Sequence, residues 1–169
     1  LRRKVGILNL RDDLEIKTIK GNIHTRLKKL EDGEFDGIIL AAAGLKRVGL
    51  QDKITEYLSV EQMIPAPAQG ILCIQCKEDN QDIIKILNEI DDKKTRIICE
   101  AEREFSKIFD GGCHTPMGCS AVIDNDELLL SGMYFSDGKL YFGETKGAIE
   151  NTKVIAHELA DIIRRQINE

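Results

Sequence analysis

The sequence lacks tryptophan and contains no apolar run near the ~20 residues that a membrane-spanning helix needs. Its first residues, LRRKVGILNL, are too short and too polar for a secretory signal peptide. These absences argue against a membrane protein and against a membrane partner. Five cysteines, an odd number without the spacing of a disulfide framework, fit a reducing compartment. We therefore predict a cytoplasmic protein.

A net positive charge is confined to the N-terminal region. Residues 1–30 carry nine Lys or Arg against three Asp or Glu, whereas residues 31–169 carry fifteen against twenty-six. A basic region on an acidic protein suggests an anionic partner held locally. No aromatic residue interleaves with these cations, and the acidic remainder would repel a polyanion, so we expect no nucleic-acid partner.

The first part of the chain is typical of an α/β domain. Apolar runs predict strands at residues 4–10, 14–19 and 35–44, the last buried on both faces as in a parallel sheet. Between them, residues 23–32 predict a helix that Asn22 begins and Gly33 ends.

The pattern changes after a turn at residues 63–70, which hold two of the three prolines. A strand at 71–79 is followed by amphipathic helices at 81–91 and 95–109. Two or three strands within 120–147, joined by the polar turns DNDE (124–127) and SDGK (136–139), and a last helix at 152–166 complete the chain. This order predicts an α+β domain with a small antiparallel sheet and helices.

Several cysteines could take part in catalysis, metal binding or covalent attachment. Cys113 follows two glycines and could be a core residue, a metal ligand, a nucleophile or an attachment point. With His114 and Cys119 it could bind zinc, although a fourth ligand is not evident. The CIQC motif at 73–76 lies in an expected strand, where residues three apart point to opposite faces, which favours structural cysteines.

Five cations lie where anions could gather. Arg2 and Arg3 begin the first expected strand, Lys20 ends the next, Arg26 lies one turn inside the helix, and Arg47 follows the buried strand. Ligands of α/β sheets collect at such strand ends, and guanidinium groups match carboxylates bidentately. The pattern predicts a site for a polycarboxylate.

The motifs LRR, KGNIHTRLKKLEDGEFDGIILAAAGLKRVGL, IPAPAQGIL, CEAEREF and GGCHTPMG occur in an order that closely resembles the porphobilinogen deaminases, also called hydroxymethylbilane synthases. The resemblance covers nearly the whole chain. It implies a transferase of porphyrin and tetrapyrrole biosynthesis, which joins four porphobilinogen molecules into hydroxymethylbilane and releases ammonia. By resemblance, Cys113 carries a dipyrromethane cofactor through a thioether.

The same resemblance implies that the cations bind carboxylates, because each pyrrole carries an acetate and a propionate. It implies that Arg2, Arg3, Lys20 and Arg26 bind the cofactor, and that Arg26 and Arg47 bind the substrate and the growing polypyrrole chain. Some positions depart from the family. Lys20 stands where arginine is usual, His114 where glutamine is common, and residues 65–70 read PAPAQG instead of the commoner PAVGQG.

The family has a further N-terminal lobe that holds its catalytic aspartate, so we expect no catalytic residue in this chain. The resemblance implies that residues 1–64 form most of a second domain like those of periplasmic binding proteins. Residues 65–80 would return to the first domain, and residues 81–169 would form a third. We expect a monomeric parent enzyme and an inactive, self-associating fragment. The alternative is a non-enzymatic module that binds an anion or zinc.

Overall fold

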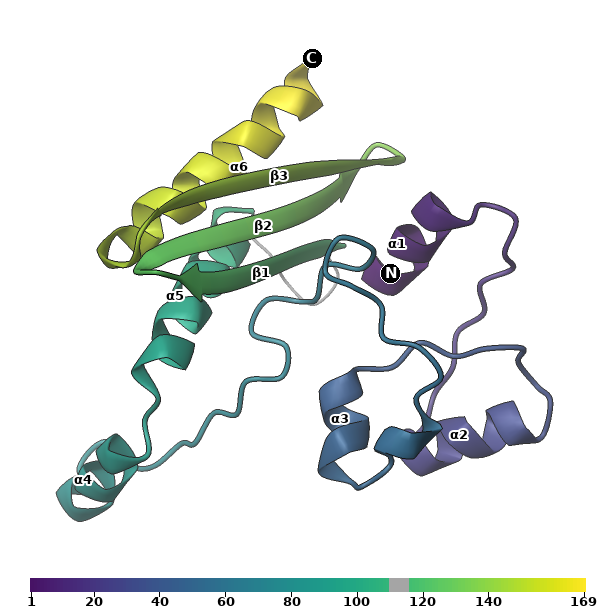
Figure 1. Cartoon of the computed structure of the whole chain (residues 1–169), viewed down its shortest axis with the longest axis horizontal. Helices are drawn as coiled ribbons and strands as arrows, with labels where there is room; N and C mark the ends of the chain where they lie inside the picture. The colour runs from purple at the N-terminus through teal and green to yellow at the C-terminus, as the bar shows by residue number, and fades with distance from the viewer. Residues whose placement is uncertain (110–115) are drawn as a thin grey trace. The chain divides into compact units, whose positions relative to one another are not determined.

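The computed structural model describes residues 1–109 and 116–169 (Figure 1). The chain divides into two compact units, Leu1 with Arg3–Met63 and Arg2 with Ile64–Glu169. Cys113 and its neighbours at 110–115 lie outside the described residues. No helix among those that are described is long and apolar enough to cross a bilayer.

The first unit is built from short helices. They are α1 (Arg2–Leu10, whose Arg2 groups with the second unit), α2 (Ile23–Glu31), α3 (Ala42–Arg47) and the 3-10 turn η1 (Gln51–Lys53). The expected helix after Asn22 is confirmed, because the Asn22 side chain accepts a hydrogen bond from the Thr25 amide at 2.9 Å. Gly33, with φ of 77°, follows the end of α2, as predicted.

The strand expected at residues 4–10 is wrong, since α1 occupies this stretch. The apolar run is short, and a short run cannot distinguish a strand from a buried helix by periodicity alone. The strands expected at 14–19 and 35–44 are also absent from the described part of this unit; residues 42–44 instead begin α3. A strand exists only as one member of a hydrogen-bonded ladder, and these segments have no such partner in the structure.

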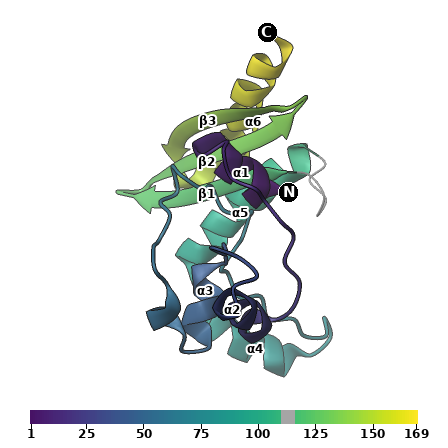
Figure 2. The ribbon, with the colours of Figure 1, turned by 90° about the vertical axis from the view of Figure 1, so that its right-hand side faces the viewer.

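The second unit is an α+β layer structure, as the sequence predicts. Its elements are α4 (Gln81–Glu89), α5 (Lys93–Ile108), β1 (Met117–Asp124), β2 (Glu127–Ser136), β3 (Lys139–Ala148), η2 (Ile149–Asn151) and α6 (Thr152–Asn168). The strands form an antiparallel sheet in the order β1-β2-β3, and α5 and α6 cover one face of it (Figures 1 and 2). The strand expected at 71–79 forms no ladder among the described residues.

Two tight turns set the register of this sheet. Asn125 and Asp126 have φ of 47° and 65°, and Asp137 and Gly138 have φ of 50° and 81°. Positive φ at both central residues is typical of a type I′ hairpin, whose twist matches that of the strands. The polar pairs that marked turns in the sequence therefore fix which residues face α5 and α6.

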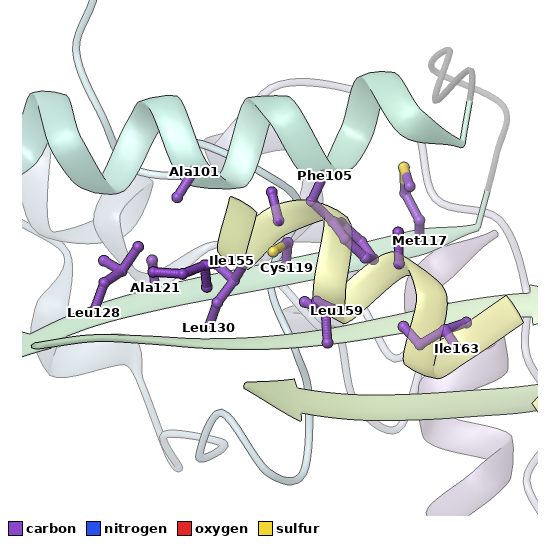
Figure 3. Close-up of a cluster of buried hydrophobic side chains, with 12 residues drawn as sticks. Ala101, Phe105, Met117, Cys119, Ala121, Leu128, Leu130, Ile155, Leu159 and Ile163 are labelled. Atoms are coloured by element: carbon purple, nitrogen blue, oxygen red, sulfur yellow. The ribbon is translucent and has the colours of Figure 1, made fainter. Parts of the chain in front are cut away.

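The core lies between the sheet and these two helices (Figure 3). Phe105 of α5, Leu128 and Leu130 of β2, and Leu159 and Ile163 of α6 are fully buried. Facing them, Gly132 pairs with Gly143 across β2 and β3. A Cβ atom at either glycine would lie 2.9 Å from a Leu159 methyl carbon, so the glycine pair allows α6 to approach the sheet closely.

Replacement of Gly132 by alanine tests this close approach. The added methyl group would displace Leu159 and Phe105, whose ring carbon lies 3.0 Å from the Cβ position. We expect Gly132→Ala to lower the free energy of unfolding by about 1–3 kcal/mol, measured by urea titration with circular dichroism. The exposed Lys139→Ala on the same sheet should change it by less than about 0.5 kcal/mol. Equal effects of the two substitutions would contradict the proposed packing.

Candidate functional site

Phe109, which directly follows α5, is held by an aromatic stack. The Phe109 ring packs on Tyr134 of β2 at a centroid distance of 4.4 Å and an angle of 25°. Arg164 of α6 lies over the same ring at 5.3 Å, and its Nη2 donates to the Ile108 carbonyl at 2.9 Å. The C-terminal end of α5 is thus fixed by contacts to a strand and to another helix.

The chain at Pro116 is fixed by the same strand. The Phe135 amide donates to the Pro116 carbonyl at 3.1 Å, directly before β1. Tyr134 and Phe135, which are neighbours in β2, therefore hold the chain on both sides of residues 110–115.

Cys119, the other cysteine of the GGCHTPMG motif region, is a core residue. Its side chain is fully buried, and burial raises the pKa of the thiol, with the Glu102 carboxylate adding to the rise. A metal ligand must be a thiolate, which this environment disfavours. Cys119 therefore does not suit the zinc site considered from the sequence, whereas Cys113 and His114 lie outside the described residues.

In the first unit, Arg3 and Arg26 lie close enough to influence each other. Arg3 is half-buried and donates from Nη1 to the Ile39 carbonyl at 3.2 Å, and Arg26 donates from Nε to the Gly21 carbonyl at 2.8 Å. Burial lowers the pKa of the Arg3 guanidinium, and the charge of Arg26 lowers it further. The structure thus brings Arg3 and Arg26 near each other, although the strand ends from which the sequence placed them are absent from the described residues.

Carboxylates do not neutralise this pair. In the described ranges, no Asp or Glu forms a salt bridge with Arg3 or Arg26, although Lys28, Lys29 and Lys53 of the same unit are paired. The two guanidinium groups bond to backbone carbonyls, which orient them without cancelling their charge. Such an arrangement suits an anionic ligand with carboxylate groups.

The other three predicted cations occupy different surroundings. Lys20 is exposed before α2, and Arg47 is exposed at the end of α3. Arg2 groups with the second unit, where Nη1 donates to the Ile64 carbonyl at 2.5 Å and Nη2 donates to Gln69 Oε1 at 3.0 Å. Only Arg26 among the predicted cations acts on the pKa of Arg3 in the part of the chain that is described.

Glu102 is a buried residue that the sequence reasoning missed. Its carboxylate accepts hydrogen bonds from the Ala68 amide at 2.6 Å and from the Ala121 amide at 2.9 Å. Burial raises the pKa of this carboxyl group, and the two amide hydrogen bonds oppose the rise. The signal was available, because Glu102 falls within the apolar stripe of α5, beside Ala101 and one turn before Phe105.

Comparison with known proteins gives consistent matches along the chain. Residues 1–85 match the family model described as porphobilinogen deaminase, dipyromethane cofactor binding domain. Residues 96–164 match the model described as porphobilinogen deaminase, C-terminal domain.

Curated relatives agree with these models. A porphobilinogen deaminase of Fusobacterium nucleatum is 50% identical over 99% of this chain and 56% of its own length. Those of Clostridium novyi and Lysinibacillus sphaericus are 40% and 45% identical over 99% and 98% of the chain. The chain thus spans just over half the length of the relatives it matches. With two successive family models and these relatives in agreement, the chain belongs to the porphobilinogen deaminase family.

Proposed function

We propose that this chain is the C-terminal portion of a transferase that condenses four porphobilinogen molecules into hydroxymethylbilane and releases ammonia. Family membership supports the reaction. The structural observation that carries the proposal is the pair of Arg3 and Arg26, two oriented guanidinium groups without a described carboxylate partner. Porphobilinogen and its polymers are polycarboxylates, so their acetate and propionate groups match this pair.

Cys113 is the proposed attachment point of the dipyrromethane cofactor. It follows Gly111 and Gly112, which leave backbone space for a bulky pyrrole on the sulfur. The nearby Cys119 is excluded by its burial in the core. When bound, dipyrromethane would supply a primer that substrate units extend. The protein's own part is to hold the thioether between the anchored ends at Phe109 and Pro116.

The cations have the complementary part of binding and orienting carboxylates. Arg3 and Arg26 provide two fixed charges, and Arg2 presents a guanidinium held by Ile64 and Gln69. We assign Lys20 and Arg47 a peripheral part in the same function, because both are exposed and carry positive charge. Fixed charges of this kind position reacting groups without reorganising during the reaction.

The proposed parent has three domains. Residues 1–64 would form most of a second domain of the periplasmic-binding-protein type, residues 65–80 would return to the first, and residues 81–169 would be the third. The greater length of the relatives supports this, as do the apolar segments at 14–19 and 71–76, which lack ladder partners among the described residues. The catalytic aspartate would belong to the first domain, so the isolated chain is expected to be inactive.

We propose a monomeric cytoplasmic parent, whereas the isolated chain would associate with itself through residues 71–76. Leu72 and Ile74 in this segment are 73% and 61% exposed. An extended apolar segment without a ladder partner is a template for pairing with another chain.

The attachment of the cofactor is tested in the complete reading frame, compared with its Cys113→Ala variant. We expect a colour with Ehrlich's reagent and a mass increment on the Cys113 peptide in the unmodified protein, and neither in the variant. Cys119→Ala provides the matched control and should retain both signals, because Cys119 is buried in the core. The isolated 169-residue chain should form no hydroxymethylbilane from porphobilinogen.

A colourless complete protein that has been supplied with porphobilinogen would refute the proposal. The non-enzymatic anion-binding module would then explain Arg3 and Arg26. Zinc in the purified protein, lost in Cys113→Ala, would instead favour a metal-binding module. Product formation by the isolated chain would refute the assignment of the catalytic residue to another domain.

The role of Arg26 is tested by Arg26→Ala and Arg26→Lys in the complete protein. Loss of a charged hydrogen-bond donor should raise the KM for porphobilinogen by about 10- to 100-fold. Arg26→Lys should recover part of this loss, because it restores the charge without the planar fork. Lys28→Ala on α2, which removes an exposed ion pair with Asp32, is the control and should leave the KM unchanged. An unchanged KM in Arg26→Ala would contradict the site.

A further inference from the structure

We propose that Glu102 is a positioning residue that acts through residues 64–70 to hold the guanidinium of Arg2. The inference rests on the proposed function, in which Arg2 binds carboxylates of the cofactor. Five hydrogen bonds carry it, and all of their residues belong to the second unit.

The first step is the fixation of Ala68 by Glu102. The two carboxylate oxygens receive the amides of Ala68 and Ala121 at 2.6 and 2.9 Å. A carboxylate only accepts hydrogen bonds, so it satisfies both donors at once, whereas glutamine would turn an NH₂ group toward one of them. The chemistry of the site therefore requires glutamate if both amides are to be bonded.

The second step is the conformation that this bond maintains. Ala68 has φ of 58°, in the left-handed region that favours glycine over residues with a Cβ atom. A non-glycine residue persists in this region when its surroundings over-determine it. The short hydrogen bond to Glu102 supplies that constraint at Ala68 itself.

The third step is a second anchor at the other end of the segment. The Cys119 amide of β1 donates to the Pro65 carbonyl at 2.9 Å. At the neighbouring Gly118, an added Cβ atom would lie 2.8 Å from the carbonyl oxygens of Ile64 and Pro65. The start of the segment is therefore pressed directly against the backbone of β1.

Arg2 bonds to the segment close to both anchors. Its Nη1 donates to the Ile64 carbonyl, which adjoins Pro65, and its Nη2 donates to the Gln69 side chain, which adjoins Ala68. One guanidinium thus bridges two points that β1 and Glu102 hold in place. If the Ala68 amide lost its hydrogen bond to Glu102, Gln69 would shift and the Arg2 guanidinium would be less firmly oriented.

A purely structural role explains the arrangement less well. The Ala121 amide alone could be satisfied by a neutral acceptor, which avoids the cost of a buried charge. Glu102 is only 6% exposed, and no salt bridge to it occurs within residues 1–109 and 116–169. The second acceptor of this buried carboxylate is used by Ala68, the residue whose backbone most needs support.

The test uses hydrogen exchange measured by NMR on the 169-residue chain. Glu102→Gln should accelerate exchange of the Ala68 amide and of the Arg2 guanidinium protons by about tenfold or more. Glu104→Gln, the same change two residues along α5, should leave both rates unchanged. Adding Ala68→Gly to Glu102→Gln should restore slow Arg2 exchange in part, because glycine adopts positive φ without support.

If Glu102→Gln accelerated exchange of the Ala121 amide but not of the Ala68 amide or the Arg2 guanidinium, the proposal would be overturned. The same holds if Ala68→Gly failed to slow Arg2 exchange in the Glu102→Gln background. If Glu102→Gln does not fold, the exposed Gln69→Ala replaces it. That variant should accelerate exchange of the Arg2 guanidinium but keep the Ala68 amide protected. Unchanged Arg2 exchange in Gln69→Ala would equally overturn the proposed path.

A second experiment distinguishes failure of this inference from failure of the proposed function. In the complete reading frame, Glu102→Gln should lower the fraction of Cys113 that carries the pyrrole adduct, and Glu104→Gln should not. Absence of any adduct in the unmodified protein would refute the proposed function while the exchange result still stands. An adduct unaffected by Glu102→Gln, together with unchanged Arg2 exchange, would refute the positioning role alone.

Discussion

The carboxylate of Glu102 joins three parts of the second unit that are distant in the sequence: α5, the middle of β1 and residues 64–70. Burial of a charge is costly unless its hydrogen-bonding capacity is used, and here both oxygens accept backbone amides. The sheet and the helices could pack around a neutral residue. The path of residues 64–70, and with it the orientation of the Arg2 guanidinium, depends on the charged carboxylate of Glu102.

The two units contribute different chemistry to the proposed function. The first unit provides Arg3 and Arg26, fixed charges that bond to carbonyls and lack a described carboxylate partner. The second holds Phe109 and Pro116, on either side of residues 110–115, through neighbouring residues of β2. In the proposed function, a covalent anchor and a set of cations would together retain a polyanion that lengthens during the reaction, so neither unit would be sufficient alone.

Local patterns predicted the parts of the fold that depend on local interactions. Asn22 and Gly33 marked the ends of α2, and the polar turns at 125–126 and 137–138 marked the hairpins. The residue pattern alone predicted strands at 14–19 and 35–44 that the described structure lacks. A strand forms only when another segment pairs with it, and a local pattern does not show that partner. α1 was missed because a short apolar run suits a helix equally well.

The site was less predictable than the fold. Residue types and their order suggested a site for an anion, but the strands expected to bring the cations together are not present among the described residues, where only Arg26 of the five acts on Arg3. Glu102 escaped notice since a single charge in an apolar stripe is normally read as a solvated position. Its importance depends on two amides that are 34 and 19 residues away in the sequence. No periodicity within α5 carries that information.

Residues 67 and 68 limit where this protein can bend. Pro67 has a fixed φ and also restricts the residue before it, and Ala68 occupies a conformation that costs about 1–2 kcal/mol for an L-residue. Hinges are residues that absorb large changes in φ and ψ, which proline and a pinned alanine cannot do. Within residues 64–70, a change in backbone direction would therefore fall to Gly70, whose φ of 96° is open to a residue without a Cβ atom.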